Sequence, residues 1–325
     1  MRVAVVGAGN FGLKHLRALS SLPGVEPVAV PTRPSRLAAL ERAGIAALPS
    51  LAAAARGARP CVIATRTGRH VADGLRAVGL GLHALVEKPL GVDAPSARRL
   101  AEAGRRRRRK VFVGCTLRFE PSLLRFRSLL PRLGRLHSVS AECRSYLPDW
   151  RRSRPYGGTY SARAAEGGVL RDLIHEIDYA GWLFGWPRAV SGRVLNLGRL
   201  GIASDELAEL HWLAPKGFPV SVHVDYLTRP TRRGILACGE HGTLEWDALA
   251  QTVTLLPGGG KPRVWRDRAP ADERLKRQAK AFLRATAGGA RGTLATAEDG
   301  VRALAICDAA RRSSSSGRSE RVRLR

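Results

Sequence analysis

The stretch RVAVVGAGNFG, residues 2–12, decides the fold of this chain. A short apolar run comes first, and three glycines follow at the spacing G-x-G-x-x-G, directly before the helical pattern FGLKHLRALSSL. In this context the glycines allow a tight turn, approach of the backbone to a pyrophosphate, and close contact between helix and strand. We therefore predict a dinucleotide-binding loop at the N-terminus of a helix, with a purely structural glycine turn as the alternative. The expected cofactor contacts here are Gly7, Gly9, Asn10, Phe11 and Gly12.

Strand and helix patterns alternate over residues 1–118. After the opening strand, apolar runs recur as VEPVAV, CVIAT, HALVEK and VFVGC, and a helical pattern separates each run from the next. Such alternation implies crossover connections and a parallel sheet with helices on both faces. We predict an α/β fold whose N-terminal domain, residues 1–118, is a doubly wound Rossmann domain.

From residue 119 the rhythm changes to longer, β-rich stretches such as FPVSVHVDYL and GTLEWDALAQTVTLL. These stretches suit a mostly antiparallel, open sheet, on which a helix over about 168–184 packs. Two helical patterns follow at about 271–286 and 297–311. We predict an α+β domain over residues 119–312, followed by a mobile tail over 313–325 that is rich in serine and arginine.

Composition limits the class of protein. With 325 residues, of which 44% are hydrophobic, the chain can fill the cores of two domains. It has no apolar run of about eighteen residues and no N-terminal signal pattern, so we expect a cytoplasmic protein with no membrane partner. Its five cysteines are scattered, with no Cys-x-x-Cys pair. This pattern predicts a reducing compartment and no metal site.

The net charge of +28 raises the question of a polyanionic partner. Most of the basic residues are arginines spread over every segment, together with abundant Ala, Gly and Leu, a pattern that also fits codon usage in a GC-rich genome. The run RRRRRK, residues 105–110, falls between a helical pattern and a strand, where a solvated loop is expected. We therefore expect no nucleic-acid partner.

The end of the second strand bears on the choice of dinucleotide. NAD-binding domains usually place a carboxylate about twenty residues after the last glycine, where it binds the adenine ribose. Here VEPVAV runs into PTRPSR, which offers Thr32, Arg33 and Arg36 instead. A hydroxyl and guanidinium groups suit a 2′-phosphate, so NADP(H) is favoured and NAD(H) is possible. The alternative is that arginine stands here by chance in an arginine-rich chain.

LVEKPL, residues 85–90, ends the fourth strand. Open α/β sheets build their sites at the carboxyl ends of strands, so Lys88 is expected beside the cofactor, with Glu87 as a neighbouring contact. Pro89 is a candidate for a cis peptide bond, which would turn the chain sharply after the lysine.

The segment GGVLRDLIHEIDYAGWLFG, residues 167–185, has a helical pattern with two faces. Leucines and isoleucines fall on one side, whereas Asp172, His175, Glu176 and Asp178 fall on the other. Taken alone, these polar residues are typical of a solvated helix face.

Together these motifs resemble those of a known family. The loop GAGNFG, the Glu-Lys-Pro of LVEKPL, LRF at 117–119 and the segment EGGVLRDLIHEID occur in the order expected for the glucose-fructose oxidoreductase, inositol dehydrogenase and rhizopine catabolism family, Gfo/Idh/MocA. The resemblance extends from Arg2 to about Ala310. It implies a Rossmann domain and then an α/β domain whose open sheet commonly makes oligomer contacts, so we expect a homo-oligomer, a dimer or tetramer. It also implies a nicotinamide cofactor and a sugar, nucleotide-sugar, cyclitol or related polyol as substrate.

The resemblance also implies roles for three residues. Lys88 matches the catalytic lysine of the family, Asp172 its aspartate and His175 its histidine. The common pattern separates aspartate and histidine by four residues and this chain by three, but on a helix both separations keep the pair on one face. We expect an NAD(P)-dependent oxidoreductase acting on CH–OH groups. His175 would be the base, Lys88 a hydrogen-bond donor to the reacting oxygen, and Asp172 their orienting group.

Other candidate residues are less specific. Thr65 and His70 lie in the loop after the third strand, where the family often places a histidine near the nicotinamide; for His70, helix capping is the alternative. The segment SYLPDWR resembles a subgroup found among enzymes of surface-polysaccharide sugar synthesis. The candidates for the substrate side are Arg118, Asp149, Trp150, Tyr160 and Arg163. As alternatives, Trp150 can belong to the core and Arg163 to an exposed loop.

Two other functions stay open. Some relatives use bound nicotinamide transiently, in redox-neutral elimination, epimerisation or glycoside cleavage. The second is a non-catalytic protein that binds a nucleotide or a polyanion through a retained Rossmann domain. The set Lys88, Asp172 and His175 argues against this second alternative.

Overall fold

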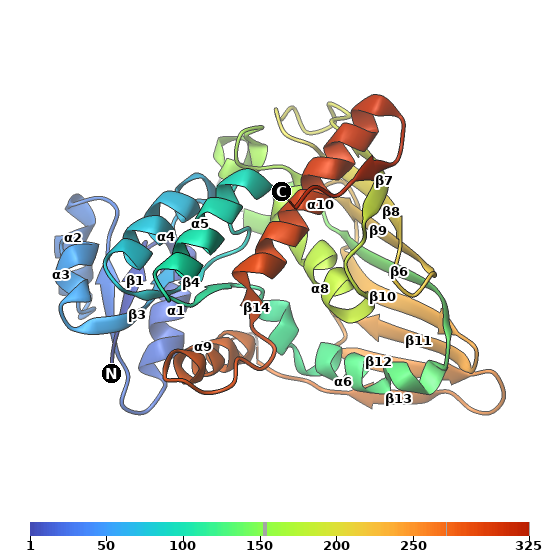
Figure 1. The fold of residues 1–325 in the computed structure, drawn as a ribbon, viewed down its shortest axis with the longest axis horizontal. Helices are drawn as coiled ribbons and strands as arrows, with labels where there is room; N and C mark the ends of the chain where they lie inside the picture. Colours follow the sequence, from blue (N-terminus) through green and yellow to red (C-terminus); the bar gives the residue numbers. More distant parts are fainter. Residues whose placement is uncertain (152–154, 271, 325) are drawn as a thin grey trace. The chain divides into compact units, whose positions relative to one another are not determined.

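A computed structural model of the chain describes residues 1–151, 155–270 and 272–324. The chain forms two compact units, whose elements are labelled in Figure 1. The first unit holds residues 1–119 and 270–301, and the second holds residues 120–269 and those from 302 onward. The second unit therefore lacks residues 270–301, which the sequence placed in a continuous domain over 119–312.

Residues 270–301 belong to the first unit because their apolar side chains are buried there. Helix α9 (Glu273–Thr286) packs against helix α1 (Asn10–Ser20). Phe282 of α9 is fully buried, with its ring centroid 6.2 Å from that of Phe112. The helix predicted from residue 271 begins at Glu273, and Ala271 itself lies outside the described residues.

The sheet of the first unit confirms the predicted doubly wound, parallel fold. Its strand order is β14-β5-β4-β3-β1-β2, and all its pairs are parallel except β14 with β5. The strands are β1 (Arg2–Val6), β2 (Glu26–Val30), β3 (Ala58–Ile63), β4 (His83–Val86), β5 (Val111–Val113) and β14 (Ala295–Thr296). Besides α1 and α9, the helices are α2 (Ser35–Arg42), α3 (Leu51–Ala55), α4 (His70–Gly79) and α5 (Ala94–Arg106). The strands are mostly apolar because a sheet covered on both faces buries most of their side chains; exposed charged residues such as Arg2 and Glu26 lie at strand starts.

The second unit is built on a nine-stranded, mostly antiparallel sheet, as predicted. The strand order is β13-β12-β11-β10-β6-β9-β8-β7-β15, and only β6 with β9 is a parallel pair. The first five strands in sequence are β6 (Leu136–Arg144), β7 (Ala189–Leu195), β8 (Leu207–Leu213), β9 (Pro219–Asp225) and β10 (Arg232–Gly239). The others are β11 (Gly242–Asp247), β12 (Thr252–Pro257), β13 (Arg263–Arg266) and β15 (Glu320–Arg321).

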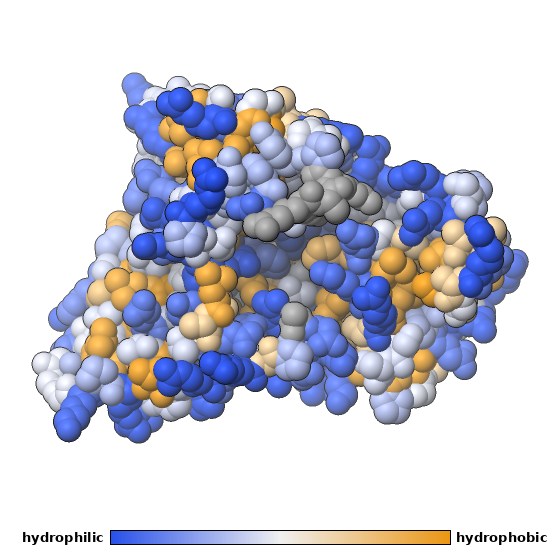
Figure 2. All heavy atoms as spheres, turned by 180° about the vertical axis from the view of Figure 1, so that it is seen from behind, coloured by the Kyte–Doolittle hydropathy of each residue, from blue (hydrophilic) through white to orange (hydrophobic). Residues whose placement is uncertain are grey.

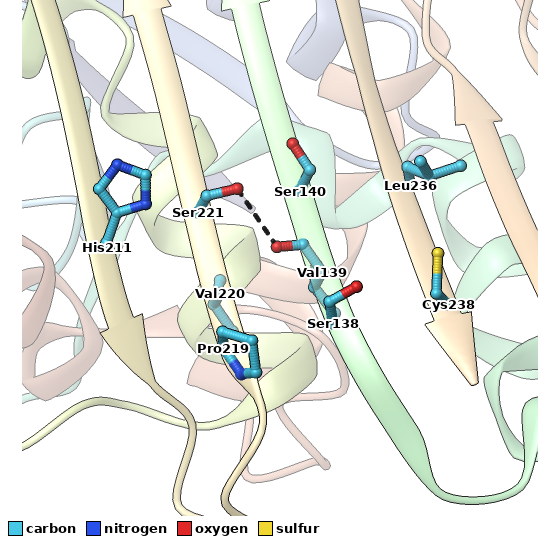
Figure 3. Close-up of a pocket in the computed structure, with 9 residues that line it drawn as sticks. All are labelled: Ser138, Val139, Ser140, His211, Pro219, Val220, Ser221, Leu236 and Cys238. Atoms are coloured by element: carbon cyan, nitrogen blue, oxygen red, sulfur yellow. Dashed lines mark hydrogen bonds between the residues drawn. The ribbon is translucent and has the colours of Figure 1, made fainter. Parts of the chain in front are cut away.

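The two faces of this sheet differ. Helix α8 (Ile174–Phe184) packs against β6 and β9, and helix α6 (Pro121–Leu129) packs against β11 and β12. Along β8 the side chains alternate, so that Leu210 and Trp212 are buried while His211 and Leu213 are exposed. Figure 3 shows side chains of β6, β8, β9 and β10 that line a shallow hollow on the sheet. The sheet therefore buries one face and leaves the side chains of the other exposed.

The segment over residues 167–185 departs from the prediction of one continuous amphipathic helix. It forms two helices, α7 (Val169–Asp172) and α8, separated at Leu173, whose backbone has φ −100° and ψ 30°. The helical pattern taken alone is typical of a solvated face, but its carboxylates are buried: Asp172 is 3% exposed and Glu176 is fully buried. Glu176 accepts a hydrogen bond of 2.7 Å from Arg233 Nε on β10. The ion pair with Arg233, on a strand distant in sequence, thus allows Glu176 to be buried.

The tail predicted to be mobile is instead ordered against the edge of the sheet. Helix α10 (Ala297–Ser316) continues through the serine run, and β15 pairs with β7. The hydroxyls of Ser313 and Ser314 accept hydrogen bonds of 2.9 Å from the backbone N–H groups of Gly192 and Val194 on β7. These contacts occupy donors that an edge strand would otherwise present to solvent. Arg325 lies outside the described residues.

The surface agrees with the spread of arginine over the sequence. Hydrophilic residues make up most of the face shown in Figure 2, with apolar residues in separate patches among them. No helix within the described residues has the length and apolar character needed to cross a bilayer. The described residues also contain no cluster of three or more His, Cys, Asp or Glu side chains placed to hold a metal.

Candidate functional site

The glycine loop has the geometry that the sequence predicted. Gly7 follows β1 with φ +94°, and a Cβ there would lie 2.7 Å from the carbonyl oxygen of Ala64. A Cβ on Gly12 would lie 1.7 Å from the carbonyl oxygen of Gly7. At these two positions a side chain would clash with the backbone, so only glycine fits. At Gly9, the N-cap of α1, a Cβ would meet nothing within 4 Å, so the chain leaves space just where the first amides of the helix need acceptors.

The residues after β2 lie close to this loop. Arg36 stands at the start of α2 and donates a hydrogen bond of 2.8 Å from Nη2 to the carbonyl oxygen of Ala8. Thr32 and Arg33 precede it, and all three side chains are exposed. The Arg36 guanidinium is thereby bound to the glycine loop while its side chain remains exposed. A dinucleotide fits this arrangement, because the backbone can receive a pyrophosphate and the arginine a further phosphate.

Lys88 follows β4, at the carboxyl end of the parallel strands, and its side chain is half-buried. The Lys88–Pro89 peptide bond is cis, as the sequence suggested. Glu87 is only 6% exposed. Its carboxylate lies 2.7 Å from His15 Nε2 and accepts a hydrogen bond of 3.2 Å from the backbone N–H of Lys88. Glu87, predicted as a cofactor contact, thus directs its carboxylate toward groups of the protein.

Electrostatics keep Glu87 ionised despite its burial. Burial raises the pKa of Glu87. The hydrogen bond and charge of His15, together with the charges of Lys88 and His70, lower that pKa by more than burial raises it. The net result is a pKa below the ordinary value, so a carboxylate lies beside the lysine near neutral pH.

His70 was predicted as a cofactor contact, with helix capping as the alternative. It is the first residue of α4 and is 2% exposed. Its Nδ1 lies 2.7 Å from the carbonyl oxygen of Pro89, and its Nε2 lies 3.0 Å from that of Thr65. The structure therefore directs both ring nitrogens to backbone carbonyls, not to the helix amides. Thr65 Oγ1 is buried and has no hydrogen-bond partner within the described part of the chain. This hydroxyl could therefore form a hydrogen bond with a bound ligand.

The other two candidate catalytic residues lie in the second unit. Asp172 ends α7 and accepts a hydrogen bond of 2.7 Å at Oδ2 from the hydroxyl of Tyr226. His175 lies in the first turn of α8 and is half-buried. Because Leu173 interrupts the helix between them, the argument that a three-residue spacing keeps both on one helix face does not apply. Their relation depends on the turn at Leu173.

Tyr226 is a candidate that the sequence analysis missed. It is fully buried, directly follows β9, and meets the ring of Trp150 edge-on at 5.3 Å between centroids. Burial raises the pKa of Tyr226, and the charge and hydrogen bond of Asp172 raise it further. Tyr226 therefore acts as a hydrogen-bond donor to Asp172 at neutral pH. No local pattern distinguishes this tyrosine, since Asp172 lies far from it in sequence.

The residues predicted for the substrate side fall into different surroundings. Trp150 donates from Nε1 to Ser145 Oγ at 2.9 Å and contacts Tyr226, so it joins the cluster around Asp172. Tyr160 is half-buried. Asp149 is exposed in the turn Leu147–Arg151.

The two arginines predicted for the substrate side are each paired. Arg163 is 54% exposed and forms an ion pair of 3.0 Å with Glu166. Arg118, in the first unit, is 1% exposed, and its Nη1 lies 3.1 Å from Asp299 Oδ2. Burial of Arg118 beside a carboxylate favours a structural role for it over direct substrate contact.

Comparisons with known proteins give the family to which the chain belongs. Residues 1–115 match the oxidoreductase family with an NAD-binding Rossmann fold, and residues 131–245 match the GFO/IDH/MocA C-terminal domain. The rhizopine catabolism protein MocA of Rhizobium meliloti is 31% identical over 95% of this chain and 93% of its own length. The chain belongs to the Gfo/Idh/MocA family.

Other members of the Gfo/Idh/MocA family resemble the chain over its whole length. Inositol 2-dehydrogenase 2 of Saccharopolyspora erythraea is 29% identical over 98% of this chain and 94% of its own. Among solved structures, levoglucosan dehydrogenase in complex with NADH has a TM-score of 0.88 at 18% identity and full coverage of both chains. The WlbA dehydrogenase of Bordetella pertussis, in complex with NADH and UDP-GlcNAcA, has a TM-score of 0.82 at 22% identity, covering 100% of this chain and 99% of that one. As a Gfo/Idh/MocA protein, the chain is an oxidoreductase with an NAD-binding Rossmann domain.

Proposed function

We propose that the chain is a dehydrogenase that transfers a hydride between a nicotinamide cofactor and a secondary alcohol of a sugar, nucleotide-sugar or cyclitol. One observation carries this proposal: Asp172, which the resemblance matches to the family's aspartate, is buried and hydrogen-bonded to Tyr226, with His175 at the start of the next helix. Burial of a carboxylate is costly, and the hydrogen bond from Tyr226 offsets part of that cost. The names of the relatives, MocA and inositol dehydrogenases, favour a cyclitol or sugar.

Each of the three residues has a role that suits its chemistry. When bound, the nicotinamide supplies the hydride acceptor or donor. His175 would take the hydroxyl proton onto its ring, because imidazole titrates near neutral pH. Lys88 would donate a hydrogen bond to the reacting oxygen and stabilise its developing negative charge. Asp172, fixed by Tyr226, would orient its neighbours and balance their positive charge.

For the cofactor, we propose a preference for NADP(H), with NAD(H) as a possible second cofactor. Arg36 bonded to the glycine loop, with Thr32 and Arg33 exposed beside it, supports a site for a 2′-phosphate. The remaining contacts would come from Gly7, Gly9, Asn10, Phe11, Gly12 and Thr65, with Glu87 and His70 holding Lys88 in place. For the substrate, Trp150 is the better supported contact because it joins the cluster around Asp172, with Asp149, Tyr160, Arg163 and Arg118 as weaker ones.

We further propose that the chain works as a homo-oligomer, a dimer or tetramer, in the cytoplasm. Exposed side chains on the sheet of the second unit include Leu213 at 66% and Leu236 at 42%, and Leu236 lines a hollow of about 250 Å³ (Figure 3). Apolar surface of this kind is typical of subunit contacts. All five cysteines are free, which suits a reducing compartment.

Two measurements test the proposed function. Fluorescence titration with NADPH and NADH would give the dissociation constant of each cofactor. Nicotinamide absorbance would then be followed with free sugars, UDP-sugars and cyclitols. Tight binding with turnover on any of these substrates supports the proposal. Conversion of substrate without net change of free nicotinamide would favour the redox-neutral alternative, and failure to bind either nucleotide would overturn the proposal.

A further inference from the structure

Two buried histidines from different helices of the first unit hold the turn that carries Lys88. This turn, residues 87–89, follows β4. His15 reaches Glu87 from α1, and His70 reaches Pro89 from α4. Lys88 therefore lies between two residues that are each fixed by a histidine.

The contact of His15 is buried and specific. Its side chain is 1% exposed, and Nε2 lies 2.7 Å from Glu87 Oε1. His15 Nδ1 has no hydrogen-bond partner among the residues described, so the ring is anchored through Nε2. A buried carboxylate needs such a partner, because burial without one costs several kcal/mol. The site also has no room to spare, since a Cβ on Gly114 would lie 3.0 Å from the Glu87 carboxylate.

The contacts of His70 fix the other end of the turn. A neutral imidazole has one N–H, whereas His70 has both nitrogens against carbonyl oxygens. Burial lowers the pKa of His70, although the two carbonyls and the charges of Glu87 and Asp73 raise it in part. We assign the N–H to Nδ1, which makes the shorter contact of 2.7 Å, to the carbonyl oxygen of Pro89. His70 thereby ties Pro89 to helix α4.

We propose that His15 and His70 are positioning residues that clamp the Glu87–Pro89 turn and so fix the direction of Lys88. The proposal rests on the proposed function, because it assigns these histidines to the same reaction. His15 lies on the helix that begins at the glycine loop, so its bond to Glu87 joins the pyrophosphate-binding helix to the lysine turn. Cofactor loop and lysine are thereby held in one rigid frame within the first unit. Neither histidine has to touch substrate or cofactor to act.

Substitutions at His15, His70 and a control histidine separate positioning from folding. His15→Leu removes the donor to Glu87, whereas His15→Gln keeps an amide N–H at a similar reach. His70→Leu releases Pro89 in the same way. His83→Gln is the matched control, because His83 begins the same strand and accepts a hydrogen bond from the backbone N–H of Lys110, away from the lysine turn.

The readouts are kcat and KM with the active substrate, dissociation constants for NADPH and NADH, and backbone hydrogen exchange over residues 84–91. We expect His15→Leu and His70→Leu to lower kcat roughly tenfold to a hundredfold, as misplaced catalytic groups do, with KM and cofactor affinity changed less than threefold. His15→Gln should recover most of the lost kcat. Exchange over 84–91 should quicken in both leucine variants and stay unchanged in His83→Gln.

The exchange experiment keeps this proposal separate from the proposed function. If the wild-type chain turns over no sugar or cyclitol, the proposed function fails. The clamp is then tested by hydrogen exchange alone. Unchanged exchange over 84–91 in both leucine variants would overturn the clamp whatever the activity. Wild-type kcat in an active enzyme would overturn it too, as would loss confined to KM. Where a leucine variant does not fold, Glu87→Gln gives the comparison with a smaller change, and wild-type exchange and kcat in Glu87→Gln would then overturn the clamp.

Discussion

The hydroxyl of Tyr226 donates a hydrogen bond of 2.7 Å to Oδ2 of Asp172, and both side chains are at most 3% exposed. The two residues lie on different elements of the second unit, at the end of α7 and just after β9. The bond replaces solvent as the partner of a buried carboxylate. Asp172 is thereby held at one position.

The substitution Tyr226→Phe tests this relationship. It removes the buried hydroxyl that donates to Asp172 Oδ2, so the free energy of unfolding should fall by about 1–3 kcal/mol. Turnover should fall by roughly tenfold, because Asp172 loses its fixed position. The control is Tyr156→Phe, which removes a hydroxyl bonded to the carbonyl oxygen of Leu200 in the same unit. Equal turnover in the two variants would contradict the role of Tyr226.

Lys88→Ala and His175→Ala test the proposed chemistry directly. Loss of a base or of a hydrogen-bond donor at the reacting oxygen typically costs about 10²- to 10⁴-fold in rate, so kcat should drop by that order in each variant. The affinity for NADPH should stay nearly intact, because the glycine loop is unchanged. Steady-state kinetics and fluorescence titration measure the two quantities. A variant that retains wild-type turnover would remove its residue from the mechanism.

Arg36→Ala tests the cofactor preference. The guanidinium lies on the glycine loop through its bond to Ala8, and its loss should weaken NADPH binding by about tenfold while leaving NADH binding nearly unchanged. Arg42→Ala is the control, since Arg42 lies at the end of the same helix and bonds only weakly, at 3.4 Å, to Ala38. Equal losses for both cofactors would assign Arg36 to the loop itself and not to a 2′-phosphate.

The pH dependence of stability should depend on Glu87. Burial raises its pKa, but His15, Lys88 and His70 lower it below the ordinary value of 4.5. A carboxyl whose pKa is lower in the folded state stabilises the fold above the unfolded value and loses that contribution as the pH falls through the folded value. Near neutral pH the wild-type chain should therefore be more stable than Glu87→Gln, and the difference should shrink below pH 4.5.

Urea unfolding over a range of pH measures the contribution of Glu87. Glu102→Gln is the control, because Glu102 is 40% exposed in its side chain and makes only a long contact with Arg106. Its stability should follow that of the wild type at every pH. A difference between Glu87→Gln and the wild type that stays constant from neutral to acid pH would show that the charge of Glu87 is not what stabilises the turn.

Local chemistry explains which features the sequence could predict. Gly7 and Gly12 are required by contacts within a few residues of the loop or one strand away, so their spacing alone indicates the turn. Lys88 follows an apolar strand, and in a parallel sheet that position is fixed by topology. The alternation of strands and helices likewise follows from period and composition, and the parallel sheet confirms it.

The features that the sequence could not predict depend on distant partners. Tyr226 and Asp172 are separated by 54 residues, and Arg233 and Glu176 by 57. The helical pattern alone places Glu176 on the solvated face, because a local pattern does not show that Arg233 on β10 pairs with Glu176. In the same way, the serines of the tail became part of the fold only through β7, 121 residues before Ser313. In each case a polar group is buried because a non-local partner satisfies it.

The buried pair of Glu176 and Arg233 gives a test of that last point. Arg233→Met leaves a fully buried carboxylate without its guanidinium and should lower the free energy of unfolding by about 3–5 kcal/mol. The double variant Glu176→Leu with Arg233→Met removes both charges and should recover most of that loss, because the cost lies in the unpaired charge. Arg106→Met, which breaks an exposed pair, should change stability little. If the double variant is as unstable as Arg233→Met alone, packing around the arginine stem, and not the buried charge, is what holds α8 on the sheet.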